Sequence, residues 1–127
     1  MKAFNIEELR RVAQRRLPRA VFNFIDGGAE DERTLRDNCA AFSRVRLLPK
    51  MLIDVSSIQT KTSILGKESR LPLAIAPTGA VGFGWPGGDL AIARAAARFG
   101  IPYSLSMSAT TSIEHIAEKA PGRLWFQ

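Results

Sequence analysis

The sequence predicts an α/β protein in which buried parallel strands alternate with helices, and two observations support this prediction. Short apolar runs at residues 73–76, 101–105 and 124–127 have the length and composition of strands that are buried on both faces. Helical segments at 89–99 and 112–119 separate them, so the order is β-α-β-α-β, with parallel strands joined by crossover helices. The strand starts lie roughly 20 to 30 residues apart, a spacing found in both barrels and open α/β sheets.

Length and composition are those of one ordinary soluble domain. The chain has 127 residues, of which 46% are hydrophobic and 24% are charged. No run approaches the roughly 18 apolar residues that a membrane helix needs. Cys39 is the only cysteine, so no internal disulfide can form. We expect a cytoplasmic protein, since charged residues interrupt any secretory signal at the amino terminus, namely Glu7, Glu8, Arg10 and Arg11.

The formal net charge of +6 raises the question of an anionic partner. The simplest interpretation is a solvated helix face, and the alternative is peripheral contact with an anionic membrane surface. The sequence has no zinc-ligand spacing and no aromatic-basic RNA motif, so no nucleic-acid partner is expected. Much of the positive charge comes from five arginines near the amino terminus: Arg10, Arg11, Arg15, Arg16 and Arg19.

The first 45 residues predict three helices. Asn5 can cap the first, with Glu8 completing a capping box, and Pro18 ends it and opens the next. The second helix, near 19–25, stops at a glycine pair. A third is expected over 30–42, with three side chains directed inward: Leu35, Cys39 and Phe42.

Two further local signals predict a hairpin and a helix cap. The stretch 45–69 is rich in β-branched residues, and Gly66-Lys67 is typical of a hairpin turn. Thr111 and Glu114 form a capping box for the helix that starts near Ser112. We therefore divide the chain into a helical and hairpin segment, 1–70, and a β-α-β-α-β portion, 71–127.

The glycine-rich loop after the first strand has two interpretations. Residues 82–87 match G-x-G-x-x-G, which would indicate a nicotinamide-dependent Rossmann enzyme. Against this, the first glycine lies well beyond the strand, and Pro86 stands where helical amides should face a pyrophosphate. No acid follows the second strand to bind a ribose hydroxyl. The alternative is a βα loop at the carboxyl end of a (β/α)8 barrel, where such loops build the active site.

Polar or backbone-exposing residues follow each of the three predicted strands. Thr78 and Gly79 come after the first strand, Ser106 after the second, and Gln127 ends the third. Carboxyl ends of parallel strands share one edge, so these residues should share one rim, although each alone is equally an ordinary turn residue. Backbone groups with an amide side chain suit the edge of a flat heteroaromatic cofactor.

The segment 22–32 resembles the amino-terminal signature of the flavin-dependent family that oxidises 2-hydroxy acids. This family includes glycolate oxidase, the flavin-dependent L-lactate dehydrogenases and mandelate dehydrogenase. The resemblance implies the amino-terminal part of a (β/α)8 TIM barrel, with about three of eight strands, preceded by a helical segment and a small hairpin. Further similar segments occur in family order, at 47–54, 75–79, 93–96, 105–106 and 124–127.

In this family the cofactor is FMN, and the resemblance implies where it binds. The backbone of Pro77, Thr78 and Gly79 would lie along the flavin ring, while Ser106 and Gln127 would bond its pyrimidine edge. No metal is expected. Gly79, where some oxidases carry alanine, favours a dehydrogenase. Gly79 also fits the mandelate dehydrogenase branch, as do 85–86 and 88–90.

The implied reaction converts an L-2-hydroxy acid into a 2-oxo acid, with a quinone, another carrier or oxygen as electron acceptor. The family's histidine base, arginines and lysine lie on later strands, so we expect no catalytic residue within this chain. His115 should be a surface residue. We expect these 127 residues to be an inactive, unstable fragment of a longer homo-oligomeric enzyme. The alternatives are a non-catalytic flavin-binding module and an NAD-dependent Rossmann enzyme.

Phe24 departs from the family pattern. The family usually has tyrosine there, where the hydroxyl helps to hold the substrate carboxylate. Phenylalanine keeps the ring and loses a bond worth roughly 1.5–3 kcal/mol. Either the substrate differs, or other arginines bind the carboxylate, or activity is weak; a simple core aromatic is the structural alternative.

Overall fold

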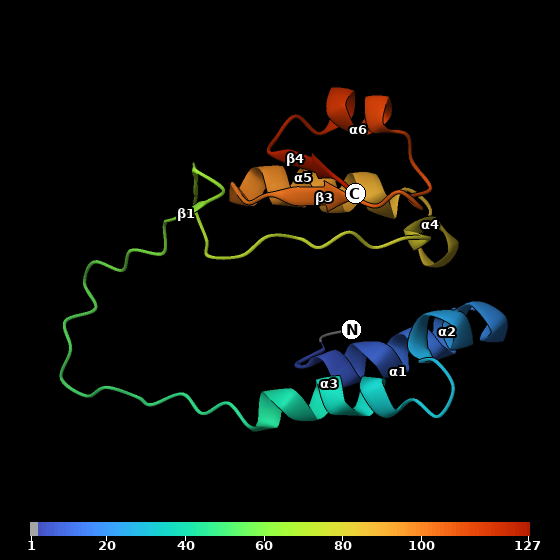
Figure 1. The fold of residues 1–127 in the computed structure, drawn as a ribbon, viewed down its shortest axis with the longest axis horizontal. Coiled ribbons are helices and arrows are strands. Elements are labelled where there is room, and N and C mark those ends of the chain that lie inside the picture. The colour runs from blue at the N-terminus through green and yellow to red at the C-terminus, as the bar shows by residue number, and fades with distance from the viewer. Residues whose placement is uncertain (1–2) are drawn as a thin grey trace. The chain divides into compact units, whose positions relative to one another are not determined.

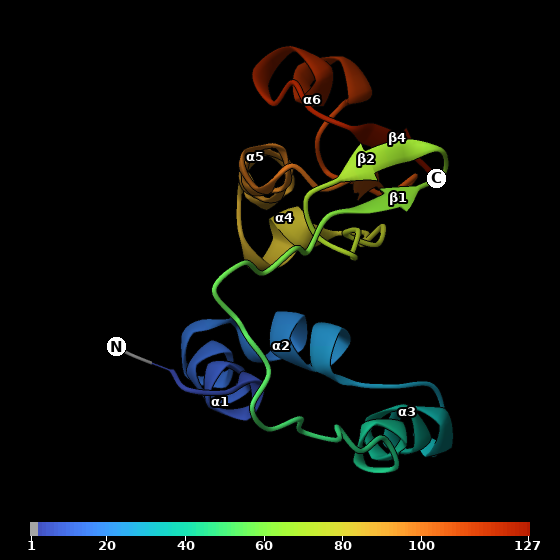
Figure 2. The same cartoon turned by 90° about the vertical axis from the view of Figure 1, so that its left-hand side faces the viewer.

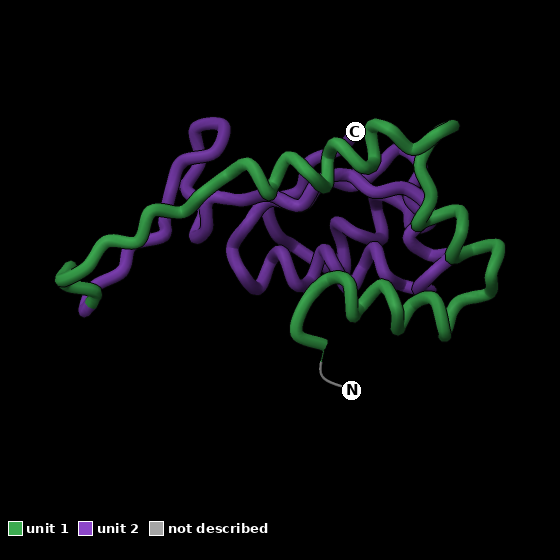
Figure 3. Tube along the Cα trace, turned by 90° about the horizontal axis from the view of Figure 1, so that it is seen from below, with its two compact units in different colours: residues 1–55 green, residues 56–127 purple. Residues whose placement is uncertain are grey.

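The computed structural model describes residues 3–127 and consists of two compact units, 1–55 and 56–127, which Figure 3 colours separately. The first unit contains helices, and the second contains the hairpin, the parallel strands and their helices. The hairpin, which the sequence groups with the helices, thus lies in the same unit as the parallel strands.

Local capping explains the helices of the first unit, α1 (Ile6–Arg16) and α2 (Arg19–Asp26). The Asn5 side chain accepts from the Glu8 amide at 2.8 Å, and the Glu8 carboxylate accepts from the Phe4 amide at 2.8 Å. The predicted capping box is therefore present, with Glu8 reaching one residue further back than expected. Arg10 joins the two helices through a bidentate ion pair with Asp26.

The third helix, α3 (Arg33–Ser43), corrects two expectations. It begins at Arg33 rather than at Glu30, because Glu30 and Glu32 both have positive φ and form a turn before it. The expected inward side chains are not buried: Leu35 and Cys39 are exposed and Phe42 is 83% exposed. Helical spacing shows which side chains share a face, but not whether another element covers that face.

The hairpin of the second unit pairs β1 (Thr62–Ile64) with β2 (Lys67–Ser69) in antiparallel register. Its turn is Leu65-Gly66, one residue earlier than predicted, because Lys67 already pairs with Ile64. Both turn residues have positive φ, as the tight two-residue hairpin turn requires, and glycine takes its second position.

Three extended segments lie parallel in sequence order. The strands β3 (Tyr103–Leu105) and β4 (Leu124–Phe126) pair in parallel, with Ser104 opposite Trp125. The run 73–76 joins the other side of β3 through a single bridge at Ile75, whose amide donates to the Pro102 carbonyl at 2.9 Å. The expectation that this run is a strand buried on both faces is wrong. Among residues 3–127 it pairs with β3 alone, so its other edge and much of its surface stay exposed.

Two helices cover this small sheet, as Figures 1 and 2 show. Helix α5 (Gly88–Phe99) follows the short α4 (Val81–Gly84) and ends at Gly100 in the left-handed conformation, as predicted. The side chain of Ser112, not Thr111, caps α6 (Ile113–Lys119), so the predicted capping box is off by one residue. Small residues on α5 allow close packing, and the core consists of Ala93, Ala96, Ile101, Tyr103, Leu105, Ile116 and Ala120.

Candidate cofactor site at the carboxyl ends of the strands

The residues that follow β3 and β4 are joined directly. The Ser106 hydroxyl donates to Oε1 of Gln127 at 3.0 Å, and the Met107 amide donates to the same oxygen at 3.3 Å. The backbone of Gln127 continues the strand pairing, since its amide donates to the Leu105 carbonyl at 3.0 Å. The two strand ends therefore form one rim, as the sequence predicts.

The loop after the first extended run joins the same rim. A β-carbon added at Gly79 would lie 3.0 Å from Cβ of Ser108 and 3.5 Å from Oγ of Ser106. The next amide, of Ala80, donates to the Ser108 carbonyl at 3.0 Å. Gly79 thus lies against the turn that carries Ser106, and Pro77 and Thr78 lead the exposed backbone toward it.

The hydrogen bonds fix the orientation of the Gln127 amide. A backbone N–H can only donate, so the atom that faces Met107 must be the amide oxygen. Among residues 3–127, the Gln127 NH2 group and the Thr78 and Gly79 amides have no hydrogen-bond partner. The rim therefore offers several donors, which suits the oxygen- and nitrogen-rich edge of a flavin ring.

The glycine-rich loop has a packing explanation that needs no dinucleotide. A β-carbon at Gly82 would lie 2.3 Å from Oγ1 of Thr110, so only glycine fits there. Gly87 has a φ of +76° where α5 begins. Asp89, fully buried in the first turn of α5, would repel a pyrophosphate at that helix end. The Rossmann interpretation thus has no support in the structure.

Several residues of this region were not anticipated from the sequence. Ser108 donates its amide to the Ser106 hydroxyl at 3.1 Å, which completes the turn after β3. Its position two residues after Ser106, at the carboxyl end of a strand, was the available signal. Asp89 and Thr110 also contact each other, and no local sequence pattern indicates that pairing.

The remaining predicted positions lie outside this rim. His115 is an exposed residue on α6, as expected. Phe24 is exposed on α2 in the first unit, and its role in substrate binding stays a prediction. The pKa of Tyr103, a core residue of β3, is raised first by burial and then by the negative charge of Asp89.

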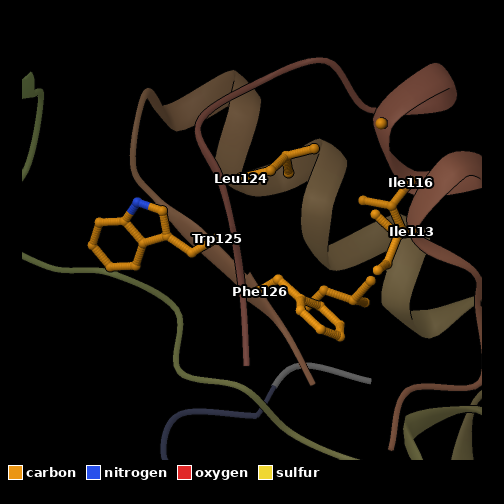
Figure 4. A pocket seen from close by; sticks show the side chains of 7 residues that line it. Ile113, Ile116, Leu124, Trp125 and Phe126 are labelled. Carbon is orange, nitrogen blue, oxygen red and sulfur yellow. The ribbon is translucent and has the colours of Figure 1, made fainter. Parts of the chain in front are cut away.

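An apolar hollow of about 220 Å³ lies between α6 and β4. Figure 4 shows Leu124 and Phe126 directed toward Ile113 and Ile116, whereas Trp125 points to the other side of the strand. The residues that line it are apolar apart from the indole N–H of Trp125, whose ring points away from the other lining side chains. The rim, not this hollow, is the candidate cofactor site.

Comparison with known proteins identifies the family. The model of the FMN-dependent dehydrogenase family matches residues 13–127. The chain is 47% identical over 124 residues to (S)-mandelate dehydrogenase of Pseudomonas putida, covering 98% of this chain and 32% of that protein. It is 41% identical over 127 residues to glycolate oxidase 3 of Arabidopsis thaliana, covering 100% of this chain and 34% of that protein.

A solved structure agrees with these relatives. The crystal structure of the monotopic membrane protein (S)-mandelate dehydrogenase superposes with a TM-score of 0.92 at 46% identity, covering 100% of this chain and 34% of that one. The chain thus spans about a third of the length of the proteins that it matches. The predicted likeness to the mandelate dehydrogenase branch is confirmed, and FMN is the family's cofactor, as predicted. The chain belongs to the FMN-dependent dehydrogenase family.

Proposed function

We propose that this chain binds the edge of FMN in an enzyme that oxidises an L-2-hydroxy acid to the 2-oxo acid. The observation that supports the proposal most is the joined pair of Ser106 and Gln127, which lies against the Gly79 turn and carries outward donors. Because the chain spans a third of its relatives' length, the reaction belongs to the complete gene product that carries this chain.

Each rim residue has a distinct task in this proposal. FMN supplies the capacity to accept two electrons from the substrate carbon that carries the hydroxyl. The Gln127 NH2 group and the amides of Thr78 and Gly79 donate to the ring edge, where reduction increases negative charge. The Ser106 hydroxyl orients the Gln127 amide by donating to its oxygen, and the Ser108 amide in turn holds that hydroxyl in place.

The wider architecture follows from the same proposal. Residues 71–127 form the first three strands of a TIM barrel, although the described residues close no barrel, and 1–70 form the preceding segment. The proposal assigns no proton-transferring residue to this chain. It includes homo-oligomerisation and cytoplasmic localisation of the complete gene product. Within residues 3–127, no helix is long and apolar enough to cross a bilayer. Peripheral contact at the cytoplasmic membrane face is proposed because a solved relative is a monotopic membrane protein.

Substrate and acceptor are the finer parts of the proposal. An aryl 2-hydroxy acid such as mandelate is favoured because mandelate dehydrogenases are among the most similar relatives. A quinone or another carrier is favoured over oxygen, because glycine at position 79 accompanies dehydrogenases in the family that the chain resembles. Phe24 cannot donate a hydrogen bond to the substrate carboxylate, so that contact must come from other residues.

The test is to purify the complete gene product and assay glycolate, lactate and mandelate with a quinone analogue and with oxygen. We expect a yellow protein that oxidises mandelate fastest and prefers the quinone analogue. Replacing Gln127 with methionine keeps the side-chain length and removes the NH2 donor, so FMN affinity should fall about tenfold or more. The matched control is Glu118→Gln at an exposed position of α6, which should bind FMN like the wild type.

Two outcomes would contradict the proposal in different ways. A colourless protein that takes up no FMN would refute the cofactor site. A yellow protein that oxidises none of the three acids would favour the second candidate, a non-catalytic flavin-binding module.

A further inference from the structure

Asp89 is a fully buried carboxylate that the proposed mechanism does not use. Its Oδ2 accepts two hydrogen bonds from Thr110, one from the hydroxyl at 2.7 Å and one from the backbone amide at 3.1 Å. Its Oδ1 is buried without a hydrogen-bond partner among residues 3–127. Burial of a carboxylate is unfavourable unless hydrogen bonds or charges compensate it. The two bonds from Thr110 compensate only one of the two oxygens, so a buried acid at this position needs a further reason.

Helix capping does not explain this contact. An acid stabilises a helix start equally well from the surface, where it stays hydrated. The N-cap of α5 is Gly87, and Asp89 accepts hydrogen bonds from Thr110 rather than from amides of its own helix. The unpartnered Oδ1 also makes the site unsuitable for an anion, which would meet a second negative charge.

The contact joins the first turn of α5 to the loop after β3, which also carries Ser106. Thr110 belongs to the loop after β3, four positions beyond Ser106, whereas Asp89 and Gly82 belong to the connection after 73–76. Thr110 is held on two sides, since Gly82 approaches it so closely that an added β-carbon would overlap its hydroxyl. The Ala80 amide, in the loop after 73–76, also donates to the Ser108 carbonyl in the loop after β3.

The geometry points to Asp89 as a positioning residue for the flavin-edge site, an inference that rests on the proposed function. Asp89 fixes Thr110, and the turn between Ser106 and Thr110 is then held in the conformation in which the Ser108 amide bonds the Ser106 hydroxyl. Ser106 in turn orients the Gln127 amide. Asp89 thus acts on the cofactor site through this chain of bonds, without touching the cofactor.

The test compares FMN affinity among variants of the complete gene product by fluorescence titration of the apoprotein. Asp89→Ala removes both bonds to Thr110, and Thr110→Val removes the hydroxyl bond alone. We expect about tenfold or more weaker FMN binding in Asp89→Ala and a smaller loss in Thr110→Val. Asp89→Asn and Thr110→Ser should restore near wild-type affinity, because the asparagine oxygen accepts from both Thr110 donors and serine keeps the hydroxyl.

A matched control separates positioning from general loss of stability. Ser112→Ala removes the cap of α6, which lowers stability while both hydrogen bonds between Asp89 and Thr110 stay in place. It should leave FMN affinity unchanged. Hydrogen exchange adds an independent readout: the Thr110 amide should lose protection in Asp89→Ala and keep it in Ser112→Ala.

The outcomes distinguish this inference from the proposed function. If the wild type binds FMN and both Asp89→Ala and Thr110→Val bind it equally well, the positioning role is refuted while the cofactor site stands. Equal weakening in Ser112→Ala, or no rescue by Asp89→Asn and Thr110→Ser, would also refute it. If Asp89→Ala does not fold, Thr110→Val and its serine rescue decide. If the wild type itself takes up no FMN, the proposed function fails, and the positioning role fails with it.

Discussion

The two units of this chain carry similar amounts of apolar sequence and use it differently. In unit 56–127, seven apolar residues form a continuous core, with Ile116 only 1% exposed. In unit 1–55, Phe22 alone among the described apolar residues is buried, at 8% exposure. An amphipathic pattern therefore stabilises a structure only where a second element covers its apolar face.

The stretch between α3 and β1, residues 44–61, has many large apolar side chains that are exposed. Large exposed apolar surface of this kind marks sites that another protein surface covers, or sites of aggregation. Within this chain, these side chains therefore contribute little to the free energy of unfolding. The exposed set comprises Leu47, Leu48, Met51, Leu52, Ile53, Val55 and Ile58.

The largest expected effect comes from truncating one apolar side chain in each unit. Ile116→Ala should lower the free energy of unfolding by about 2–5 kcal/mol, because it opens a cavity in the core. Leu48→Ala, at a side chain that is 88% exposed, should change it by less than about 0.5 kcal/mol. Urea unfolding followed by circular dichroism measures both. Similar losses for the two variants would mean that the units do not differ in packing.

Adding a methyl group should also affect the two units differently, with a smaller change in stability. A β-carbon at Gly122 would lie 2.9 Å from Cβ of Ala97 on α5, so Gly122→Ala should destabilise by about 1–3 kcal/mol through overpacking. A β-carbon at Gly28 would lie 3.0 Å from Cβ of Leu35, but α3 has no buried residue and can shift. Thermal unfolding of the two variants should show a clear fall only for Gly122→Ala. An equal fall for Gly28→Ala would show that α3 is firmly held.

Alkaline titration should affect the packed unit. The pKa of Tyr103 is raised above its ordinary value of 10.0, so folding favours the protonated phenol. The contribution of the protonated Tyr103 phenol to folding stability is fully present below pH 10.0, and it is lost as pH rises through the raised pKa of the folded state. The free energy of unfolding should therefore fall in this range for the wild type. Tyr103→Phe should remove that part of the slope, and an unchanged slope would refute the assignment.

Acid should have the smallest effect, in the helical unit. The hydrogen bond from Arg10, aided by its charge, lowers the pKa of Asp26 below 3.8. The stabilisation is present above 3.8 and is lost as pH falls through the lowered pKa of the folded state. Helix content of unit 1–55 should fall slightly in this range, since the Arg10 side chain of the ion pair is 53% exposed and the pair is therefore screened by water. Asp26→Asn should flatten that dependence, whereas a strong dependence in the variant would assign it to other acids.

The elements predicted best from the sequence are those whose signals are local. Gly100 ends α5 in the left-handed conformation, as predicted, because a glycine stop depends on neighbouring residues alone. The inward face of α3 and the burial of 73–76 were wrong. Both depend on covering elements that the pattern does not reveal.

The candidate site divides in the same way. Gly79, Ser106 and Gln127 could be predicted because the carboxyl ends of parallel strands always meet at one edge. The contact of Asp89 with Thr110 could not, because it joins residues 21 positions apart through the way α5 packs beside the loop. A buried acid looks the same in sequence as a helix-starting acid at the surface.

Whether the Gln127 NH2 group binds the flavin edge can be tested by a nuclear magnetic resonance spectrum of the complete gene product with nitrogen-15 in its glutamine side chains. One amide pair, identified by its loss in Gln127→Met, should shift when FMN is added to the apoprotein, because the Gln127 NH2 then donates to the ring edge. If FMN binds and that pair does not move, the rim at the ends of β3 and β4 is not where the flavin edge lies.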